Sequence, residues 1–385
     1  MRAVSDELFA SAFAPVEAEL RRLLPAGSVV VDAHTHLGLD EDGRTLDVAS
    51  LLAALDDVGP DARACVFPLH DPARHPAYRV PNDRVLAWAR EGGGRLTPYC
   101  RLDPREDPVA EARRCLALGA RGIKLHPRAQ AFTFGDPAAA PIFEVARDAG
   151  VPILIHAGRG MGRMDELATL ALRFPEVPLV LAHAAIADQG MFASRLRDHP
   201  SVFYDTSCFS ATDVIELFAR VPAERVVFAS DMPYGRPLPA LHLALRVAAY
   251  AGLDAAERAL VAGGTMAAVL GDAPIPAPTP PRIDAVRPVH GRLTRPMSYI
   301  STAFGAIIGA GPPIDATRGL PHLALARAAC RDPDPGLVGE VLERIDALLG
   351  AAEQLIRAGG EASSSSFALM AVAGTIAATE PVAAS

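Results

Sequence analysis

The stretch VVVDAHTHLG, residues 29–38, combines an apolar strand with two histidines at its end. Three valines lead into Asp32, His34 and His36, and the run stops at Gly38. Because successive side chains of a strand point to opposite faces, His34 and His36 point to the same side. Two imidazoles on one side of a buried strand contribute little to apolar packing, so this stretch predicts a strand with a polar site at its carboxyl end.

The alternation of strand and helix that begins here continues to about residue 270. Apolar, β-branched runs predict strands at 28–34, 62–70, 95–102, 120–126, 151–157, 178–184, 201–207 and 225–231. Helical stretches lie between them, near 47–57, 82–91, 107–119, 140–149, 163–174, 188–197, 211–220 and 237–250. Eight strands, each followed by a helix, over roughly 240 residues are typical of a (β/α)8 TIM barrel. A doubly wound open sheet is the alternative, but no G-x-G-x-x-G turn follows the first strand.

The remainder of the chain predicts a smaller helical part outside the barrel. We expect an N-terminal helix at 1–27, the barrel at 28–272, a proline-rich linker at 273–289 and a small helical C-terminal region at 290–385 with a mobile end. Helical periodicity is found near 320–331 and 336–358, and the serine run at 363–366 is read as a loop or a helix start. The predicted fold class is therefore α/β, a TIM barrel with a C-terminal helical appendage.

Composition excludes several classes of function. Half of the 385 residues are hydrophobic, which allows a large core, and the net charge of −8 with no basic block argues against nucleic-acid binding. The longest weakly polar stretch near the end, YISTAFGAIIGAGPP, is too short and too rich in Gly and Pro to cross a membrane. Five scattered cysteines and an N-terminus unlike a signal peptide predict a cytoplasmic protein. We expect no nucleic-acid or membrane partner, and a homo-oligomer is left open.

Polar residues that could carry chemistry follow the predicted strands at their carboxyl ends. They are His34 and His36 on the first strand, Lys124 and His126 on the fourth, His156 on the fifth, His183 on the sixth and Asp231 on the eighth. TIM barrels build their active sites at this face. Neutral imidazoles with a carboxylate bind Zn²⁺ and similar ions, which lower the pKa of a bound water towards ~7. For any one histidine alone, a hydrogen-bonded structural role is the alternative.

The pieces DAHTH, GIKLHP, ILIHAG, LAHA and FASDMPYG follow one another in order on these strand ends. Together they resemble the amidohydrolase superfamily, in the amidohydrolase-related (amidohydrolase 2) branch that includes the aminocarboxymuconate-semialdehyde decarboxylase-like enzymes. The resemblance covers about residues 28–270, and nothing in 275–385 takes part. It implies that His34, His36, His156 and Asp231 are metal ligands, for one or two divalent ions with Zn²⁺ as the first expectation.

The same resemblance implies catalytic roles for Asp231, His183 and Lys124. Asp231 would also accept the proton of the attacking water. His183 would be a further ligand if two metals bind, or would orient the water if one binds. Lys124 is carboxylated and bridges the metals in two-metal relatives, whereas in single-metal relatives this position need not be a ligand, and both readings stay open.

Residues next to these strand ends are candidates for substrate binding. Arg101 ends the third strand, Arg159 follows His156, and Tyr234 follows Asp231. A guanidinium at the barrel mouth could hold a substrate carboxylate, and a salt bridge between loops is the alternative. Asp205 on the seventh strand is expected to be structural. The histidines on helical or linker segments are expected at the surface, namely His199, His242, His290 and His322.

Three functions follow from this reading, in order of preference. The first is a metal-dependent hydrolase in which a hydroxide on the metal attacks an amide, ester or lactone carbon of a small molecule. The second is a metal-dependent non-oxidative decarboxylase or hydratase of a small carboxylated substrate on the same barrel. The third is a barrel without activity that serves as a scaffold, and the complete ligand set argues against it.

Overall fold

The computed structural model describes residues 2–158, 160–208, 210–309, 314–331, 337–359 and 362–380. The parallel strands are β1 (Val31–Leu39), β3 (Arg63–Pro68), β4 (Leu96–Pro98), β5 (Cys100–Arg101), β6 (Ile123–Leu125), β7 (Ile153–Ile155), β8 (Leu179–Leu181), β9 (Val202–Asp205) and β10 (Val226–Val227). A short strand, β2 (Thr45–Leu46), pairs antiparallel with the end of β1. Each of the eight predicted strand regions therefore contains strand structure.

These strands close into a barrel. The order β1-β3-β4 continues through Tyr99 into β5-β6-β7-β8-β9-β10, and neighbouring strands in each series pair in parallel. The circle is completed between β1 and the segment that follows β10. Ala33 N donates to Phe228 O at 2.9 Å, and His36 N donates to Met232 O at 2.8 Å. The predicted (β/α)8 barrel is confirmed.

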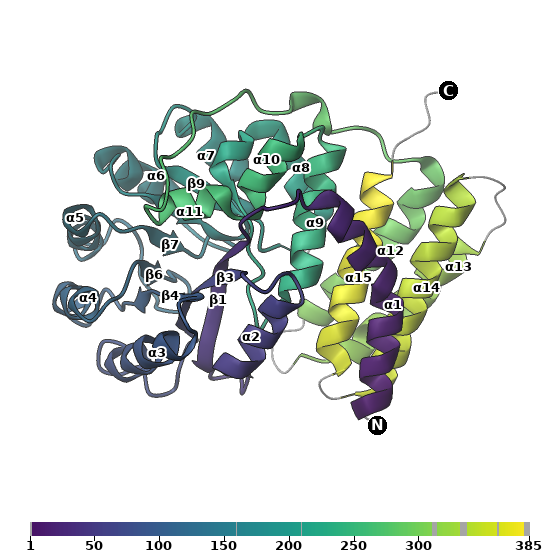
Figure 1. Ribbon diagram of the computed structural model, residues 1–385, viewed down its shortest axis with the longest axis horizontal. Coiled ribbons are helices and arrows are strands. Elements are labelled where there is room, and N and C mark those ends of the chain that lie inside the picture. Colours follow the sequence, from purple (N-terminus) through teal and green to yellow (C-terminus); the bar gives the residue numbers. More distant parts are fainter. Residues whose placement is uncertain are drawn as a thin grey trace.

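Helices cover the outside of the barrel (Figure 1). They are α2 (Val48–Asp56), α3 (Arg79–Glu91), α4 (Pro108–Ala117), α5 (Ala139–Ala149), α6 (Met164–Arg173), α7 (Gln189–Arg195), α8 (Ala211–Arg220) and α9 (Pro237–Tyr250), followed by the short α10 (Ala255–Ala259) and α11 (Thr265–Val269). Side chains such as Phe67, Tyr99 and Phe203 fill the barrel interior, together with Met266 of α11. Packed side chains therefore fill the barrel beneath the residues at the carboxyl ends of the strands.

The C-terminal part of the chain forms helices that pack against one side of the barrel, together with the N-terminal helix α1 (Arg2–Leu23) (Figure 1). These helices are α12 (Gly291–Ile308), α13 (Leu320–Cys330), α14 (Leu337–Ala358) and α15 (Ala362–Thr379). The sequence predicted α13 and α14 but not α12, and it left α15 open between a loop and a helix start. The predicted mobile end includes residues 381–385, which lie outside the described residues.

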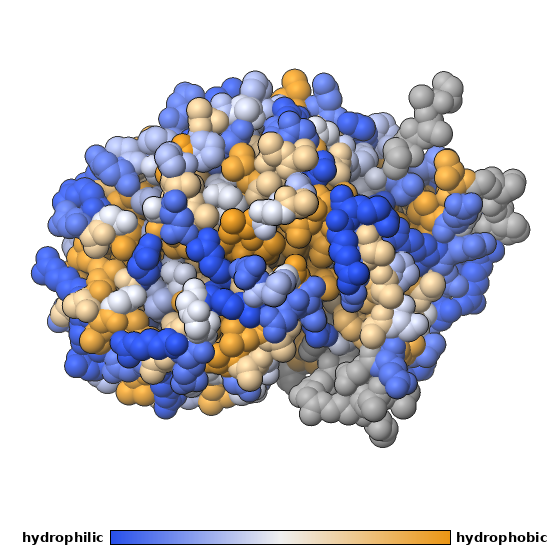
Figure 2. Space-filling view, in the orientation of Figure 1, coloured by the Kyte–Doolittle hydropathy of each residue, from blue (hydrophilic) through white to orange (hydrophobic). Residues whose placement is uncertain are grey.

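Helix α15 is the central element of this helical part. Its residues Leu369, Met370 and Val372 are fully buried, and it packs against α9, α12 and α14. A helix that is apolar on every side is stable only when it is surrounded by other elements. Figure 2 shows apolar residues near the junction of barrel and helices, with polar residues over the outer helices. In the part of the chain that is described, no helix combines the length and apolarity needed to cross a membrane.

A charged cluster joins the N-terminal helix to both parts of the molecule. Glu19 of α1 contacts Arg246 of α9 and Arg344 of α14, and its Oε2 lies 3.3 Å from His242 Nε2. We call these four residues the Glu19 cluster. Burial disfavours the charged form of Glu19, but His242 and the two arginines outweigh it and hold the pKa of this carboxyl well below its usual range.

Two histidines expected at the surface are buried. His242 is fully buried because α1 and the C-terminal helices cover α9. His199 is 8% exposed, and its ring nitrogen Nε2 lies 2.9 Å from Ala171 O. The surface expectation was therefore wrong for His242 and His199, because a helix periodicity does not tell which further elements pack on its outer face.

Candidate metal centre

The first strand fixes the position of its two histidines through its neighbours. Asp32, fully buried, accepts hydrogen bonds from His34 N at 3.2 Å and from Ser230 N at 2.9 Å. Thr35 points to the opposite side and donates to Cys65 O at 2.7 Å. The backbone of β1 is thus tied to the strands on both sides of it, so the His34 and His36 rings project from a rigid support.

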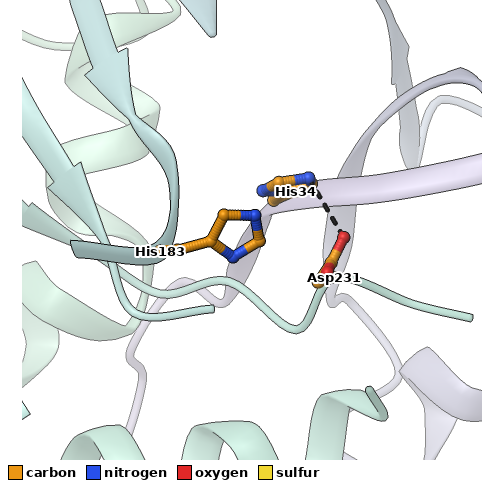
Figure 3. A group of neighbouring side chains, drawn as sticks. All are labelled: His34, His183 and Asp231. Carbon is orange, nitrogen blue, oxygen red and sulfur yellow. Dashed lines mark ion pairs between the residues drawn. The ribbon is translucent and has the colours of Figure 1, made fainter. Parts of the chain in front are cut away.

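Three candidate residues converge at the carboxyl end of the barrel (Figure 3). They are His34 from β1, His183 from the turn after β8, and Asp231 from the segment after β10. One ligand atom from each lies within 4.8 Å of the others, and His34 Nε2 is 3.1 Å from Asp231 Oδ1. Figure 3 shows the three side chains pointing towards one another from separate segments.

Two of these residues have an uncommon backbone conformation. His183 has φ +58° and Asp231 has φ +57°, both in the left-handed region that favours glycine. Such a conformation costs on the order of 1–3 kcal/mol per residue and persists where surrounding structure enforces it, often at functional sites. His183 lies two residues after the end of β8, and Asp231 lies four residues after the end of β10.

The other predicted ligands flank this group on two sides. His36 Nε2 lies 3.1 Å from the same Asp231 Oδ1, and His156 Nδ1 lies 3.0 Å from His183 Nε2. His156 also stacks on His126, with ring centroids 3.8 Å apart. Gly158 makes room for this arrangement, because a Cβ at that position would lie 2.9 Å from His156 Nε2. All four predicted ligands and His183 are therefore neighbours.

Asp205, at the end of β9, orients the His34 imidazole and holds the backbone of His183. Its Oδ2 lies 2.8 Å from His34 Nδ1, and its Oδ1 accepts from His183 N at 2.8 Å. Ser207 supports the same oxygen with its N at 3.0 Å and its hydroxyl at 2.5 Å. The sequence treated Asp205 as structural only. Its position at a strand end, like that of the other site residues, was the signal that could have identified it.

Lys124 of β6 is fully buried beside His34. Its Nζ lies 3.2 Å from His34 Nε2 and 4.6 Å from the centre of the Phe67 ring. Burial lowers the pKa of Lys124 to about 7, although the negative charge of Asp231 opposes that shift. An amine in this environment is partly neutral near physiological pH.

Burial and charge set the protonation of the other groups. Burial lowers the pKa of His36 to about 3 and also lowers the pKa of His183. For Asp231, burial favours the neutral form, but the neighbouring histidines outweigh it and hold the pKa of this carboxyl well below its usual range. A neutral imidazole and an ionised carboxylate are the forms that bind a metal.

The donor set fits a divalent metal ion. Around a tetrahedral ion with bonds of about 2.0–2.2 Å, neighbouring ligand atoms lie about 3.3–3.6 Å apart. The distance of 3.1 Å from Asp231 Oδ1 to both His34 Nε2 and His36 Nε2 is close to that spacing. Nitrogen ligands with one carboxylate are typical of zinc and of related transition metals.

A cavity of about 600 Å³ opens beside these residues. Asp231, His183 and His156 line one end of it, with Arg128 on the loop after β6. Arg128 is exposed, and its guanidinium has no polar partner among the described residues. The sequence did not single out Arg128, and GIKLHPR shows only that it lies two residues beyond His126.

The predicted substrate residues are less uniformly placed. Arg101 is buried, its Nη1 donates to Pro68 O at 3.1 Å, and it lies outside the cavity lining. Tyr234 lies beside His36, with ring centroids 5.7 Å apart, and its hydroxyl donates to Asp40 Oδ2 at 2.9 Å. Arg159 lies outside the described residues.

Comparison with solved structures finds several proteins to which this chain is similar. A 2,6-dihydroxybenzoate decarboxylase in complex with 2,6-dihydroxybenzoate is 16% identical, with TM-score 0.50 over 63% of this chain and 99% of that chain. The 5-carboxyvanillate decarboxylase of Sphingomonas paucimobilis is 16% identical, with TM-score 0.47 over 64% of this chain and 99% of that chain. A protein of Acinetobacter baumannii assigned as a probable 2-pyrone-4,6-dicarboxylic acid hydrolase is 14% identical, with TM-score 0.48 over 63% of this chain and 99% of that chain.

Sequence comparison gives the family itself. No curated protein matches this chain. The model of the amidohydrolase family matches residues 31–271, which include the whole barrel and every candidate ligand. The C-terminal helices follow the matched region. The chain belongs to the amidohydrolase family of enzymes, in its amidohydrolase 2 branch.

Proposed function

We propose that this protein is a metal-dependent hydrolase that cleaves an amide, ester or lactone of a small molecule. The observation that carries the proposal is the convergence of His34, His183 and Asp231 within 4.8 Å of one another, at the wall of a cavity of about 600 Å³. A cavity of this size accommodates a drug-sized ligand.

His34, His36, His156 and Asp231 would hold the ion, with His183 as a further ligand or as the group that orients water. We propose Zn²⁺, because the donors are imidazole nitrogens and a carboxylate oxygen. When bound, such an ion polarises a carbonyl group and lowers the pKa of a water molecule.

The side chains supply the proton transfers. Asp231 is ionised and borders the cavity, so it can accept the proton of the attacking water and return it to the leaving nitrogen or oxygen. His183, whose Nδ1 lies 2.7 Å from Ser207 O, stays oriented throughout because that carbonyl accepts its Nδ1 proton. We propose that Lys124, whose Nζ lies 3.2 Å from His34 Nε2, acts beside the metal ligands, since it is not among the residues that line the cavity.

A second candidate function is a non-oxidative decarboxylase of a carboxylated substrate. The observation that favours it is Arg128, an unpaired guanidinium at the cavity wall that could hold a carboxylate. We assign this contact to Arg128 rather than to Arg101, because Arg101 is buried and already bonded to the backbone. Tyr234, next to His36, remains our candidate for a further substrate contact.

One experiment separates these functions. Metal-loaded protein is incubated with panels of amides, esters, lactones and aromatic carboxylic acids, while acid release and carbon dioxide release are recorded together. We expect acid release without carbon dioxide. Asp231→Asn should abolish it, and the exposed Asp198→Asn should leave it unchanged. Release of carbon dioxide and the decarboxylated compound, without acid release, would replace the hydrolase with the decarboxylase, and no product from a fully loaded protein would contradict both.

A further inference from the structure

Helices from outside the family match also line the cavity beside the candidate metal centre. Helix α12 contributes Met297, Ile300, Phe304 and Ile308, and α15 contributes Met370 and Ala378. These residues follow residue 271, where the family match ends. The barrel therefore supplies one end of the cavity, and the C-terminal helices supply the other.

The lining residues form one continuous face on each helix. On α12 they lie at 297, 300, 301, 304, 305 and 308, and on α15 at 370, 374 and 378. Spacings of three and four residues place side chains on the same side of a helix. Two glycines, Gly305 and Gly374, belong to these faces, and a Cβ on Gly305 would meet no atom within 4 Å. The wall thus leaves open space in front of Gly305.

Helix α15 is tied to the barrel at both ends. Arg236, which precedes α9, donates to Ser365 Oγ at 3.0 Å, and Arg246 Nε donates to Thr379 Oγ1 at 2.6 Å. Met370, between these ties, is fully buried. The wall is therefore held at a defined distance from the candidate metal ligands.

The two ends of the cavity differ in polarity. Its charged lining residues, Arg128, Asp213 and Asp231, all belong to the barrel. Among the described residues of α12 and α15 that line it, none is charged. An ionic group placed against that wall would lose hydration without gaining a counter-ion, whereas a hydrocarbon group would gain from burial.

We propose that α12 and α15 form the binding wall for a hydrocarbon substituent of the substrate. The substrate class is a small molecule whose reactive carbonyl carries an alkyl chain, with the carbonyl at the barrel end and the chain along the helices. The identity of the reactive end rests on the proposed function, whereas the hydrocarbon wall rests on the lining of α12 and α15.

Straight-chain hydroxamic acids of increasing length test the metal-binding end of the cavity and the hydrocarbon wall separately. Their head group binds metal ions, and their tail grows by one methylene at a time. Dissociation constants are measured by calorimetry with zinc-loaded and with metal-depleted protein. We expect affinity to rise by up to about fourfold per added methylene until the cavity is filled, in both states of the protein. Removing the metal should weaken every member of the series by the same factor.

Three variants report on the wall itself. Gly305→Leu fills the open space and should abolish the dependence on chain length, and Gly305→Ala should reduce it. Gly291 is in the first turn of the same helix and outside the cavity lining, and a new Cβ there would meet no atom within 4 Å. Gly291→Leu is therefore the control and should leave the dependence of affinity on chain length unchanged. Circular dichroism checks folding, and Gly305→Ala carries the test alone if Gly305→Leu does not fold.

The outcomes distinguish the two proposals. Three outcomes would overturn the hydrocarbon wall. They are an affinity of the wild type that does not change with chain length, a Gly305→Leu variant with the same length dependence as the wild type, and no binding to either the zinc-loaded or the metal-depleted protein. Length dependence that survives metal removal without any loss of affinity would support the wall and contradict the metal-dependent function.

Discussion

Replacement of Asp205 by asparagine should weaken metal binding without breaking the fold. Asp205 is fully buried, and burial favours its neutral form, but His34, His183 and the Ser207 hydroxyl together outweigh burial and hold the pKa of this carboxyl below its usual range. Burial disfavours a charged His34, but Asp231 and Asp205 outweigh burial and raise the pKa of this imidazole, so the ring gives up a proton when it binds a metal. Because Asp205 Oδ2 lies 2.8 Å from His34 Nδ1, the neutral ring keeps its proton on Nδ1 and offers the lone pair of Nε2 to the metal. In Asp205→Asn the amide oxygen keeps the backbone donors His183 N and Ser207 N, so the amide NH₂ faces His34 Nδ1.

The consequence is a change of tautomer in His34. With a donor opposite Nδ1, the ring proton moves to Nε2, the atom that lies 3.1 Å from Asp231 Oδ1. Loss of the partner that orients a ligand histidine typically lowers metal affinity by about 10- to 100-fold. This corresponds to about 1.4–2.8 kcal/mol of binding free energy. Replacing an ionised acceptor by a neutral one should also lower the stability of the metal-free protein by about 1 kcal/mol.

The assay is a titration of metal-free protein with Zn²⁺ in the presence of a competing chelator. Asp198→Asn, an exposed change of the same kind, serves as the matched control and should bind like the wild type. Circular dichroism at the titration temperature shows that each variant is folded. A folded Asp205→Asn protein with the affinity of the wild type would refute the assignment of His34 Nε2 as the ligand atom.

Three further predictions concern the site and the helical part. Gly158→Ala should displace the His156 ring, because the new Cβ would lie only 2.9 Å from His156 Nε2. The variant should therefore lower kcat/KM at least tenfold in a steady-state assay. Glu19→Gln should lower the free energy of unfolding by about 2 kcal/mol, measured by urea denaturation. Folding depresses the pKa of Glu19, so the stability difference between the wild type and Glu19→Gln should be complete above the ordinary pKa of 4.5 and should decline as the pH falls below 4.5. A stability difference that stays constant from pH 7 to pH 3 would exclude the ion pairs of Glu19 as its cause. Dialysis against a chelator should abolish activity and lower the melting temperature, with recovery on adding back Zn²⁺; unchanged activity would exclude a metal cofactor.

The barrel could be predicted from the sequence because its strands are short and buried on both faces. Runs such as VPILIHA carry their apolar residues without interruption, and turn residues separate them from amphipathic helices. The ends of the strands were less certain. β7 covers only Ile153–Ile155, and His156 N still donates to Leu125 O of β6 at 3.0 Å, so this candidate ligand lies directly at the end of the strand pair.

The candidate site was predictable only in part, for a reason that lies in packing. The position of a residue at a strand end predicts that it reaches the barrel mouth, and this holds for His34, His183 and Asp231. It does not predict which neighbour a side chain bonds with. Asp205 and Arg101 both end strands, yet Asp205 orients His34, whereas Arg101 lies against the backbone and outside the cavity.

The C-terminal helices were the least predictable element. Helix α12 contains Pro296 and several Ser, Thr and Gly residues, which weaken the intrinsic signal for a helix. Helix α15 lacks a polar stripe, so its sequence does not show the periodicity that marks a surface helix. Their role as one wall of the cavity depends on the packing of α15 against α9 and of α12 against α15, which no local pattern records.

The central claim is that His34, His36, His156 and Asp231, with His183, hold a catalytic divalent metal. The most direct test of this claim is elemental analysis of protein purified without added metal. It compares the wild type with His34→Ala and with His322→Ala, a change on α13 outside the barrel. We predict about one or two equivalents of a transition metal in the wild type and in His322→Ala, and less than about 0.2 equivalents in His34→Ala. A folded His34→Ala protein that retains the full metal content would contradict the account.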